Sequence, residues 1–180
     1  MVYILLAEGF EETEALAPCD LMRRAGLQVA LVGVNGPVIS GSHGIRVAAD
    51  AQLCDVSLED MELLMLPGGL RGVASILQSA EAMDLIAQAD RENKRIAAIC
   101  AAPTILAKLG VTDGKQATCY PGKEPEMGSA VMVPASIVRD GRILTGRAAG
   151  SSLDFGLMLI EELCGPDAAE KVARGIVYAR

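Results

Sequence analysis

The sequence has 180 residues, of which 51% are hydrophobic and 22% charged, as is typical of a folded protein with a sizeable core. It contains no run of about 20 uncharged apolar residues, so we expect no transmembrane helix. Its 23 acidic and 16 basic residues give a net charge of -7. Because a duplex-binding surface needs clustered Lys and Arg, we expect neither nucleic acid nor an anionic membrane as a partner.

The N-terminus and the cysteines bear on the cellular compartment. The first residues, "MVYILLAEGFEE", have no basic region and turn acidic at once, unlike a secretory signal. No two of the five cysteines have the C-x-x-C spacing of a zinc or redox-pair site. We therefore expect a cytoplasmic protein with free thiols, no metal and no cofactor, in which each cysteine is by default a small buried hydrophobe.

The first part of the chain alternates between apolar β-like runs and amphipathic segments. Pro18 lies inside the first amphipathic segment and predicts either a kink or a late helix start. Strands that are apolar throughout and alternate with helices are typical of a parallel sheet covered on both faces. The expected strands are 2–7, 28–34, 62–69 and 95–99, and the expected helices are 12–26, 73–93 (in one or two pieces) and about 102–109.

The second part of the chain has a different pattern. Asp140-Gly141 stands between two β-like runs and predicts a hairpin, hence a local antiparallel pair. A helix over 151–165 follows, with Ser151 or Ser152 as its cap, and a last helix starts at Pro166. With no linker or repeat, we expect one α/β domain over 1–180.

Cys100 stands where the strand 95–99 turns into a helix, in "RIAAICAAPTILAKLG". A sharp strand-to-helix turn strains the backbone and needs small neighbours, which Ala98, Ala101 and Ala102 supply. The residue at such a turn is exposed at the carboxyl end of the sheet, beside a helix N-terminus that favours negative charge. This predicts a thiol pKa below its ordinary value of about 8.5. The alternative is a cysteine packed in the core at the end of a strand.

Two further loops are expected at the same edge of the sheet. In "LPGGLRG", Gly68 and Gly69 can bring backbone N–H groups close to a ligand, and with the N–H of Ala101 they could form an oxyanion pocket. In "AEGFEETEA", one of four glutamates could face the thiol, where burial would raise its pKa. The alternatives are an ordinary glycine turn and a helix start favoured by acidic surface residues.

Taken in order, the stretches "EGFEETEALAPCDLMRRAG", "LPGG", "AAICAAPTILA" and "DGRILTGRAAGSSLDFGLMLIEEL" resemble the ThiJ/PfpI superfamily. More narrowly, they resemble its branch with the parkinsonism-associated deglycase and bacterial YajL. The resemblance runs from about residue 2 to residue 177. It implies a flavodoxin-like (class I glutamine amidotransferase-like) α/β sandwich of three layers, with a mainly parallel sheet and a small antiparallel hairpin, and it implies a homodimer.

The resemblance also implies roles for individual residues. It places the reactive cysteine at Cys100, a protonated glutamate partner at Glu14, and backbone oxyanion donors at Gly69 and Ala101. Many members carry a histidine in a T-H-P context, where this chain reads "ATCYPG" with Tyr120 in that place.

The departure from T-H-P leaves no local histidine for a Cys-His dyad. The single histidine, His43, is expected in a solvent-exposed loop, so we do not expect peptidase activity. Tyr120, Gly68 and Cys119 are candidate pocket residues, and Cys119 is either a resolving thiol for Cys100 or a buried hydrophobe.

Three functions follow from the resemblance and the predicted thiol. The first is a cysteine-dependent enzyme acting on small reactive aldehydes or glycated adducts, of the glutathione-independent glyoxalase or deglycase type. The second is an oxidative-stress sensor whose cysteine oxidises to a sulfinate with little turnover. The third is a stress chaperone, which would need an exposed apolar patch that no segment supplies.

Overall fold

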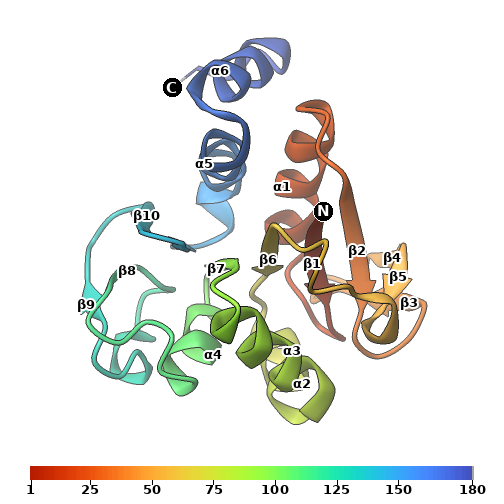
Figure 1. Cartoon of the computed structure of the whole chain (residues 1–180), viewed down its shortest axis with the longest axis vertical. Helices are drawn as coiled ribbons and strands as arrows, with labels where there is room; N and C mark the ends of the chain where they lie inside the picture. Colours follow the sequence, from red (N-terminus) through yellow and green to blue (C-terminus); the bar gives the residue numbers. More distant parts are fainter. Residues whose placement is uncertain (180) are drawn as a thin grey trace.

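A seven-stranded sheet forms the centre of the computed structural model, which describes residues 1–179 (Figure 1). Its strand order is β10-β11-β7-β6-β1-β2-β5, and every neighbouring pair is parallel except β10 and β11. The bounds are β1 (Val2–Leu6), β2 (Val29–Gly33), β5 (Ala51–Gln52), β6 (Leu63–Leu66), β7 (Arg95–Ile99), β10 (Ile137–Asp140) and β11 (Ile143–Gly146). The four predicted strands and the mainly parallel sheet are therefore confirmed.

Helices cover both faces of this sheet and give three layers, with α1, α5 and α6 on one side and α2, α3 and α4 on the other (Figure 1). Their bounds are α1 (Glu12–Arg24), α2 (Leu70–Gln78), α3 (Ala80–Arg91), α4 (Pro103–Lys108), α5 (Ser152–Cys164) and α6 (Pro166–Gly175). The expected helix over 73–93 is two helices, and it starts earlier than predicted, at Leu70. None of the helices in residues 1–179 has both the length and the apolar character needed to cross a bilayer.

Alternation along β1 shows why the two helical layers form. Ile4 and Leu6 pack in the core beneath α1 and α5, while Tyr3 and Leu5 pack in the core beneath α2, α3 and α4. Successive side chains of a strand point to opposite faces, so a strand that is apolar throughout must be covered twice. The buried pattern of β1 thus fixes the sandwich architecture.

Pro18 neither delays nor interrupts α1, which begins at Glu12 and runs past it, so the predicted late start is wrong. A proline inside a helix leaves one carbonyl without its usual N–H partner, and tertiary packing must compensate for this loss. Here α1 packs so closely on α5 that a Cβ added to Gly156 would lie only 3.0 Å from the Cα of Pro18. This packing holds the first turn of α1, and with it Glu14, at the sheet edge.

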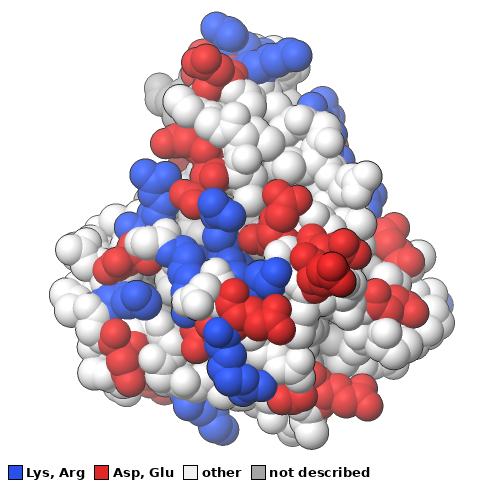
Figure 2. Space-filling view, in the orientation of Figure 1, with Lys and Arg blue, Asp and Glu red and all other residues white. Residues whose placement is uncertain are grey.

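The predicted hairpin is confirmed: β10 and β11 pair antiparallel around Asp140-Gly141, and Gly141 has a φ of 58°. Two small sheets were not predicted, β3 (Val38–Ser40) with β4 (Arg46–Ala48), and β8 (Gln116–Ala117) with β9 (Val131–Met132). Three short 3-10 helices complete the described elements, η1 (Leu53–Asp55), η2 (Glu124–Glu126) and η3 (Ala149–Ser151). Acidic and basic side chains are interspersed over the face in Figure 2.

Candidate active site

Cys100 follows the last residue of β7 and has a φ of 65°, so the predicted sharp turn is present. Its N–H donates to the carbonyl of Gly146 at 2.9 Å, and its carbonyl accepts from the N–H of Tyr120 at 2.7 Å. A positive φ strains any residue that carries a Cβ, and such strain persists only where the surrounding structure imposes it. These two bonds hold the strained residue half-exposed at the carboxyl end of the sheet.

Glu14 lies in the first turn of α1 with only 1% of its surface exposed. Its Oε2 accepts a hydrogen bond from the N–H of Gly68 at 2.9 Å, and its carboxyl is hydrogen-bonded to the thiol of Cys100. A Cβ added to Gly68 would lie 2.6 Å both from Cys100 Cβ and from Glu14 Oε2. Only a glycine at position 68 therefore lets the carboxyl and the thiol meet.

The carboxyl and the thiol ionise as a pair. Burial raises the pKa of Glu14 to about 7. Burial, followed by the negative charge of Glu14 and its hydrogen bond, raises the pKa of Cys100 to about 12, although the N–H groups of Gly69 and Ala101 oppose this rise. The expected thiol pKa below about 8.5 is therefore wrong, because burial outweighs the local helix terminus. Between these two values the pair holds one proton, which lies mainly on the sulfur because the pKa of the thiol is above that of the carboxyl.

Gly69 and Ala101 place their backbone N–H groups against the sulfur from two different loops. Gly69 has a φ of 88°, and a Cβ there would lie 2.4 Å from the carbonyl oxygen of Gly9. The loop after β6 thus packs directly on the loop after β1, which no larger residue would allow. Both donors are well placed for an anion on or next to the sulfur.

A cavity of about 530 Å³ opens at the thiol. Four of the candidate residues from the sequence line this cavity, namely Glu14, Gly69, Cys100 and Tyr120. Tyr120 is 46% exposed, so its phenol borders the solvent side of the cavity. The full lining is Glu11, Glu14, Ser42, His43, Gly69, Leu70, Arg71, Cys100, Tyr120, Ala148, Ala149 and Gly150.

Cys119 does not line this cavity. It is buried, and it lines a separate cavity of about 130 Å³ together with Arg147 and Glu124. Burial, followed by the charge of Glu124, raises the pKa of its thiol to about 11. The exposed Cys54 and Cys164 also depart from the default expectation of a buried thiol.

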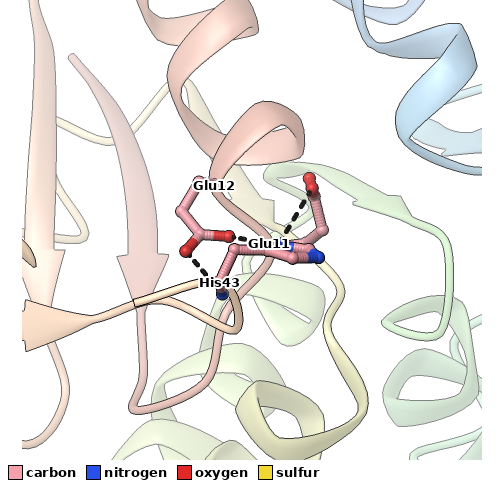
Figure 3. Close-up of side chains that lie close together, drawn as sticks. All are labelled: Glu11, Glu12 and His43. Carbon is pink, nitrogen blue, oxygen red and sulfur yellow. Dashed lines mark hydrogen bonds and ion pairs between the residues drawn. The ribbon is translucent and has the colours of Figure 1, made fainter. Parts of the chain in front are cut away.

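Sequence reasoning missed the position of His43. This residue is exposed as expected, but the turn between β3 and β4 places it in the lining of the same cavity as Cys100. Its Nδ1 lies 2.9 Å from Oε2 of Glu12, and its backbone N–H donates to Oε1 of Glu12 at 2.7 Å (Figure 3). No local signal in the sequence marks this position, because His43 and Glu12 are 31 residues apart in the chain.

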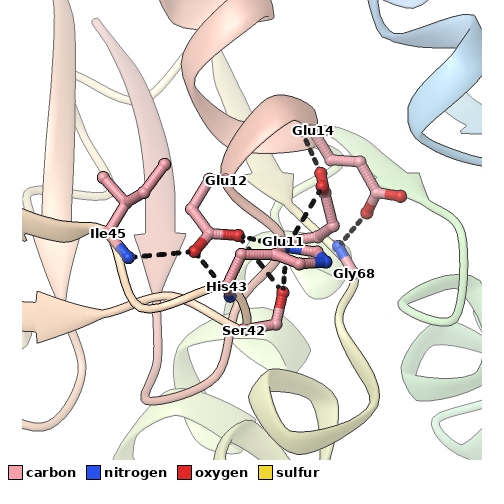
Figure 4. A network of polar contacts seen from close by, with 7 residues as sticks. All are labelled: Glu11, Glu12, Glu14, Ser42, His43, Ile45 and Gly68. Carbon is pink, nitrogen blue, oxygen red and sulfur yellow. Dashed lines mark hydrogen bonds and ion pairs between the residues drawn. The ribbon is translucent and has the colours of Figure 1, made fainter.

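Glu12 is buried and anchors the turn between β3 and β4 to α1 (Figure 4). Its oxygens accept hydrogen bonds from the backbone of His43 and Ile45 and from the hydroxyl of Ser42. Burial by itself would raise the pKa of this carboxyl, but the hydrogen bonds from His43 and from backbone N–H groups outweigh it and lower the pKa to about 2. Glu12 is therefore a carboxylate at neutral pH.

Glu11, Glu12 and His43 are also the described residues whose ligand atoms lie close enough together, within 4.8 Å, to hold a metal ion (Figure 3). Both oxygens of Glu12 already accept hydrogen bonds within the protein. A metal ion here would have to displace these bonds, so the group fits an internal polar network better than a metal centre.

A half-exposed cysteine at a strained turn, hydrogen-bonded to a buried glutamate at the edge of a parallel sheet, is the arrangement expected of the ThiJ/PfpI superfamily. The sequence pattern of the DJ-1/PfpI family matches residues 1–162, and the chain belongs to this family. It is 36% identical to the protein dj-1beta of Drosophila melanogaster over 179 residues, which cover 98% of this chain and 96% of the relative. The crystal structure of that relative superposes with a TM-score of 0.92, covering 99% of this chain and 98% of the other.

Two further relatives bear on function. A protein of Pyrococcus abyssi that is named a deglycase is 32% identical over 151 residues, covering 83% of this chain and 90% of the relative. The structure of Toxoplasma gondii DJ-1, described as oxidized, has a TM-score of 0.94 at 30% identity, covering 99% of this chain and 98% of the other. The implied family and the sandwich fold are thus confirmed.

Proposed function

We propose that this protein is a cysteine-dependent enzyme acting on small reactive carbonyls, of the glutathione-independent glyoxalase or deglycase type. The observation that carries the proposal is the hydrogen-bonded pair of Cys100 and Glu14 at the wall of a cavity of about 530 Å³. A buried carboxyl with a pKa of about 7 is suited to both giving and taking a proton near neutral pH. The deglycase name of the Pyrococcus relative points to the same chemistry.

The proposed reaction starts when the carboxylate of Glu14 takes the proton from the sulfur of Cys100 and leaves a thiolate. The thiolate attacks the aldehyde carbon of a 2-oxoaldehyde such as methylglyoxal, and Glu14 protonates the oxygen to give a hemithioacetal. The carboxylate of Glu14 then takes the proton from the former aldehyde carbon and returns it to the neighbouring carbon through an enediol, which leaves a 2-hydroxyacyl thioester. Water hydrolyses the thioester to the hydroxy acid and frees the cysteine.

Two backbone N–H groups stabilise the anionic intermediates of this reaction. The N–H groups of Gly69 and Ala101 face the sulfur, so an oxygen on the carbon bonded to that sulfur lies close to both. Removal of one such donor in other enzymes typically costs about 100-fold or more in rate. The same residues would reverse early adducts of these aldehydes on amines, which is the deglycase form of the reaction.

Lactate formation from methylglyoxal tests the proposal. We expect the Cys100→Ala variant to be inactive and the Glu14→Gln variant to lose about 100-fold in rate, the range typical of a general acid or base. Cys164→Ala is the matched control, because this thiol is exposed and does not line the cavity. Equal lactate formation in all four proteins would refute the proposed chemistry.

A second candidate function is an oxidation sensor, favoured by the half-exposed sulfur and its two backbone donors. These donors could hold the oxygens of a sulfinate at Cys100, and the Toxoplasma relative is described as oxidized. Mass spectrometry after mild peroxide treatment should then find two added oxygens on Cys100 before the other cysteines react. Uniform oxidation of all five thiols would count against a sensor.

A further inference from the structure

His43 and Glu12 form a carboxylate–imidazole pair, and His43 lines the same cavity as Cys100. Glu12 is an ionised acceptor with no proton to give, so the bond of 2.9 Å to Nδ1 requires a proton on Nδ1. The hydroxyl of Ser42 lies 3.1 Å from the same nitrogen and 3.2 Å from Glu12 Oε2. In the neutral ring the lone pair is therefore on Nε2.

The other ring nitrogen of His43, Nε2, is available to bind a water molecule. Among residues 1–179, no group is hydrogen-bonded to Nε2, and the side chain is 71% exposed while it lines the cavity of Cys100. In the view of Figure 4, Glu12 lies on one side of the ring and the Gly68 loop on the other. A ring held at one nitrogen by a carboxylate, in a cavity that also holds a nucleophile, is an arrangement suited to a general base.

We propose that His43 is the base that activates water for hydrolysis of an acyl group carried on Cys100, with Glu12 as its positioning residue. This assignment rests on the acyl thioester of the proposed function. Glu14 is buried, with 1% of its surface exposed, whereas His43 stands where the cavity meets solvent. The two groups therefore divide the proton transfers, with Glu14 acting at the sulfur and His43 on incoming water.

The proposed step is balanced without any further reactant. Nε2 of His43 takes a proton from water as the water oxygen bonds to the thioester carbon, which gives a tetrahedral oxyanion. The carbon–sulfur bond then breaks, and the sulfur leaves with the electron pair. The proton on His43 returns to the shared carboxyl–thiol pair or to solvent, and the product is the free acid.

Several charged groups surround the imidazole and set its ionisation. Glu12 and Glu11 contribute from α1, with Nδ1 4.0 Å from Glu11 Oε1, and Arg71 lines the same cavity from α2. The hydrogen bond and the charge of Glu12 raise the pKa of His43. Since only the neutral ring can take a proton from water, deacylation should speed up as pH rises through this pKa.

A reporter ester tests the assignment without relying on methylglyoxal. With p-nitrophenyl acetate, a burst of nitrophenolate measures acetylation of Cys100, and the steady state measures deacetylation. We expect His43→Gln to keep the burst and to lose about 100-fold in the steady-state rate, the size typical of a general base. Intact-mass spectrometry should then show the acetyl enzyme accumulating, and added imidazole should restore turnover in His43→Gly.

Two variants complete the design. Arg46→Gln lies on the same hairpin but outside the cavity lining, and it should match the wild type. Glu12→Gln should shift the midpoint of the deacetylation pH profile to lower pH, an effect that a purely structural role would not produce. An unchanged steady-state rate in His43→Gln, or no accumulation of the acetyl enzyme in that variant, overturns the assignment. Failure to form lactate from methylglyoxal would instead count only against the proposed function.

Discussion

The carboxyl of Glu14 and the thiol of Cys100 meet directly beside the backbone of Gly68, although the three residues come from α1, the end of β7 and the loop after β6. Burial raises the pKa of both acids, so neither group behaves as it would alone. The consequence is that the pair loses its first proton near pH 7, and the reactivity of the sulfur then depends on which partner holds the remaining proton.

Alkylation of Cys100 should follow the ionisation of Glu14. Below pH 7 the pair holds two protons and no thiolate, and the first proton is lost near the Glu14 pKa of about 7. We expect the alkylation rate of wild type to rise through about pH 7, and that rise to move to higher pH in Glu14→Gln, where the thiol must ionise on its own. Iodoacetamide labelling followed by peptide mass spectrometry measures both rates.

The exposed Cys164 supplies an internal control for this experiment. Its labelling should be the same in wild type and Glu14→Gln at every pH. Overlapping pH profiles of Cys100 in the two proteins would show that Glu14 does not govern the thiol.

Replacement of Gly68 should separate the carboxyl from the thiol. The added Cβ of Gly68→Ala would lie 2.6 Å from both Cys100 Cβ and Glu14 Oε2, which is closer than any real contact of this kind. We expect a loss of about 1–3 kcal/mol in the free energy of unfolding, as for overpacking of a core, together with loss of the alkylation step near pH 7. Urea denaturation and the labelling experiment measure the two effects.

Gly175→Ala is the matched control, because nothing lies within 4 Å of its added Cβ and its backbone is not in the left-handed region. Its free energy of unfolding should equal or slightly exceed that of wild type. If Gly68→Ala behaved like this control, the close packing at the site would be refuted.

Signals close in the sequence predicted much of the sheet edge. Small alanines around Cys100 predicted a sharp, strained turn, and Asp140-Gly141 predicted the hairpin. Both features depend on the backbone preferences of a few adjacent residues, which the sequence displays directly. The apolar runs likewise predicted the four central strands.

Long-range packing accounts for what the sequence did not reveal. The strands β3 and β4 have three residues each and no continuous apolar run, so nothing local marks them. They reach the site through backbone bonds such as the N–H of Ser42 to the carbonyl of Phe10. The raised pKa of Cys100 has the same origin, because burial is a property of the folded chain, whereas the sequence showed only the adjacent helix terminus.

Oxidation should not join Cys100 to Cys119. The thiol of Cys119 is 3% exposed, bonds to the carbonyl of Tyr120 and lines a different cavity. With its pKa raised to about 11 by burial, little thiolate is present at neutral pH to attack an oxidised Cys100. A non-reducing peptide map after mild peroxide should therefore lack this disulfide, and its appearance would disprove the separation of the two sites.

The free energy of unfolding should fall as the pH rises and Glu14 loses its proton. Its pKa is raised from 4.5 to about 7 on folding, so the folded state binds this proton more tightly than the unfolded state does. The resulting stabilisation is complete below pH 4.5 and is lost as pH rises to about 7, by about 3 kcal/mol at roughly 1.4 kcal/mol per pKa unit. Urea denaturation should show a smaller loss over this range in Glu14→Gln, and an unchanged loss would contradict the burial effect.

The ionisation of Glu12 should affect the free energy of unfolding in the opposite direction, with stability lost as the pH falls. Its pKa falls from 4.5 to about 2 on folding, so its stabilisation is complete above pH 4.5 and is lost as pH falls toward 2. Glu12→Gln removes the charge that accepts the N–H groups of His43 and Ile45, and we expect it to cost about 2 kcal/mol at neutral pH, as for hydrogen bonds to a charged group. Urea denaturation should show this deficit shrinking below pH 4.5. The exposed Glu59→Gln, which lies outside the helices, should show no deficit at any pH. A deficit in Glu12→Gln that stayed constant down to pH 2 would mean that Glu12 stabilises the hairpin by its shape and not by its charge.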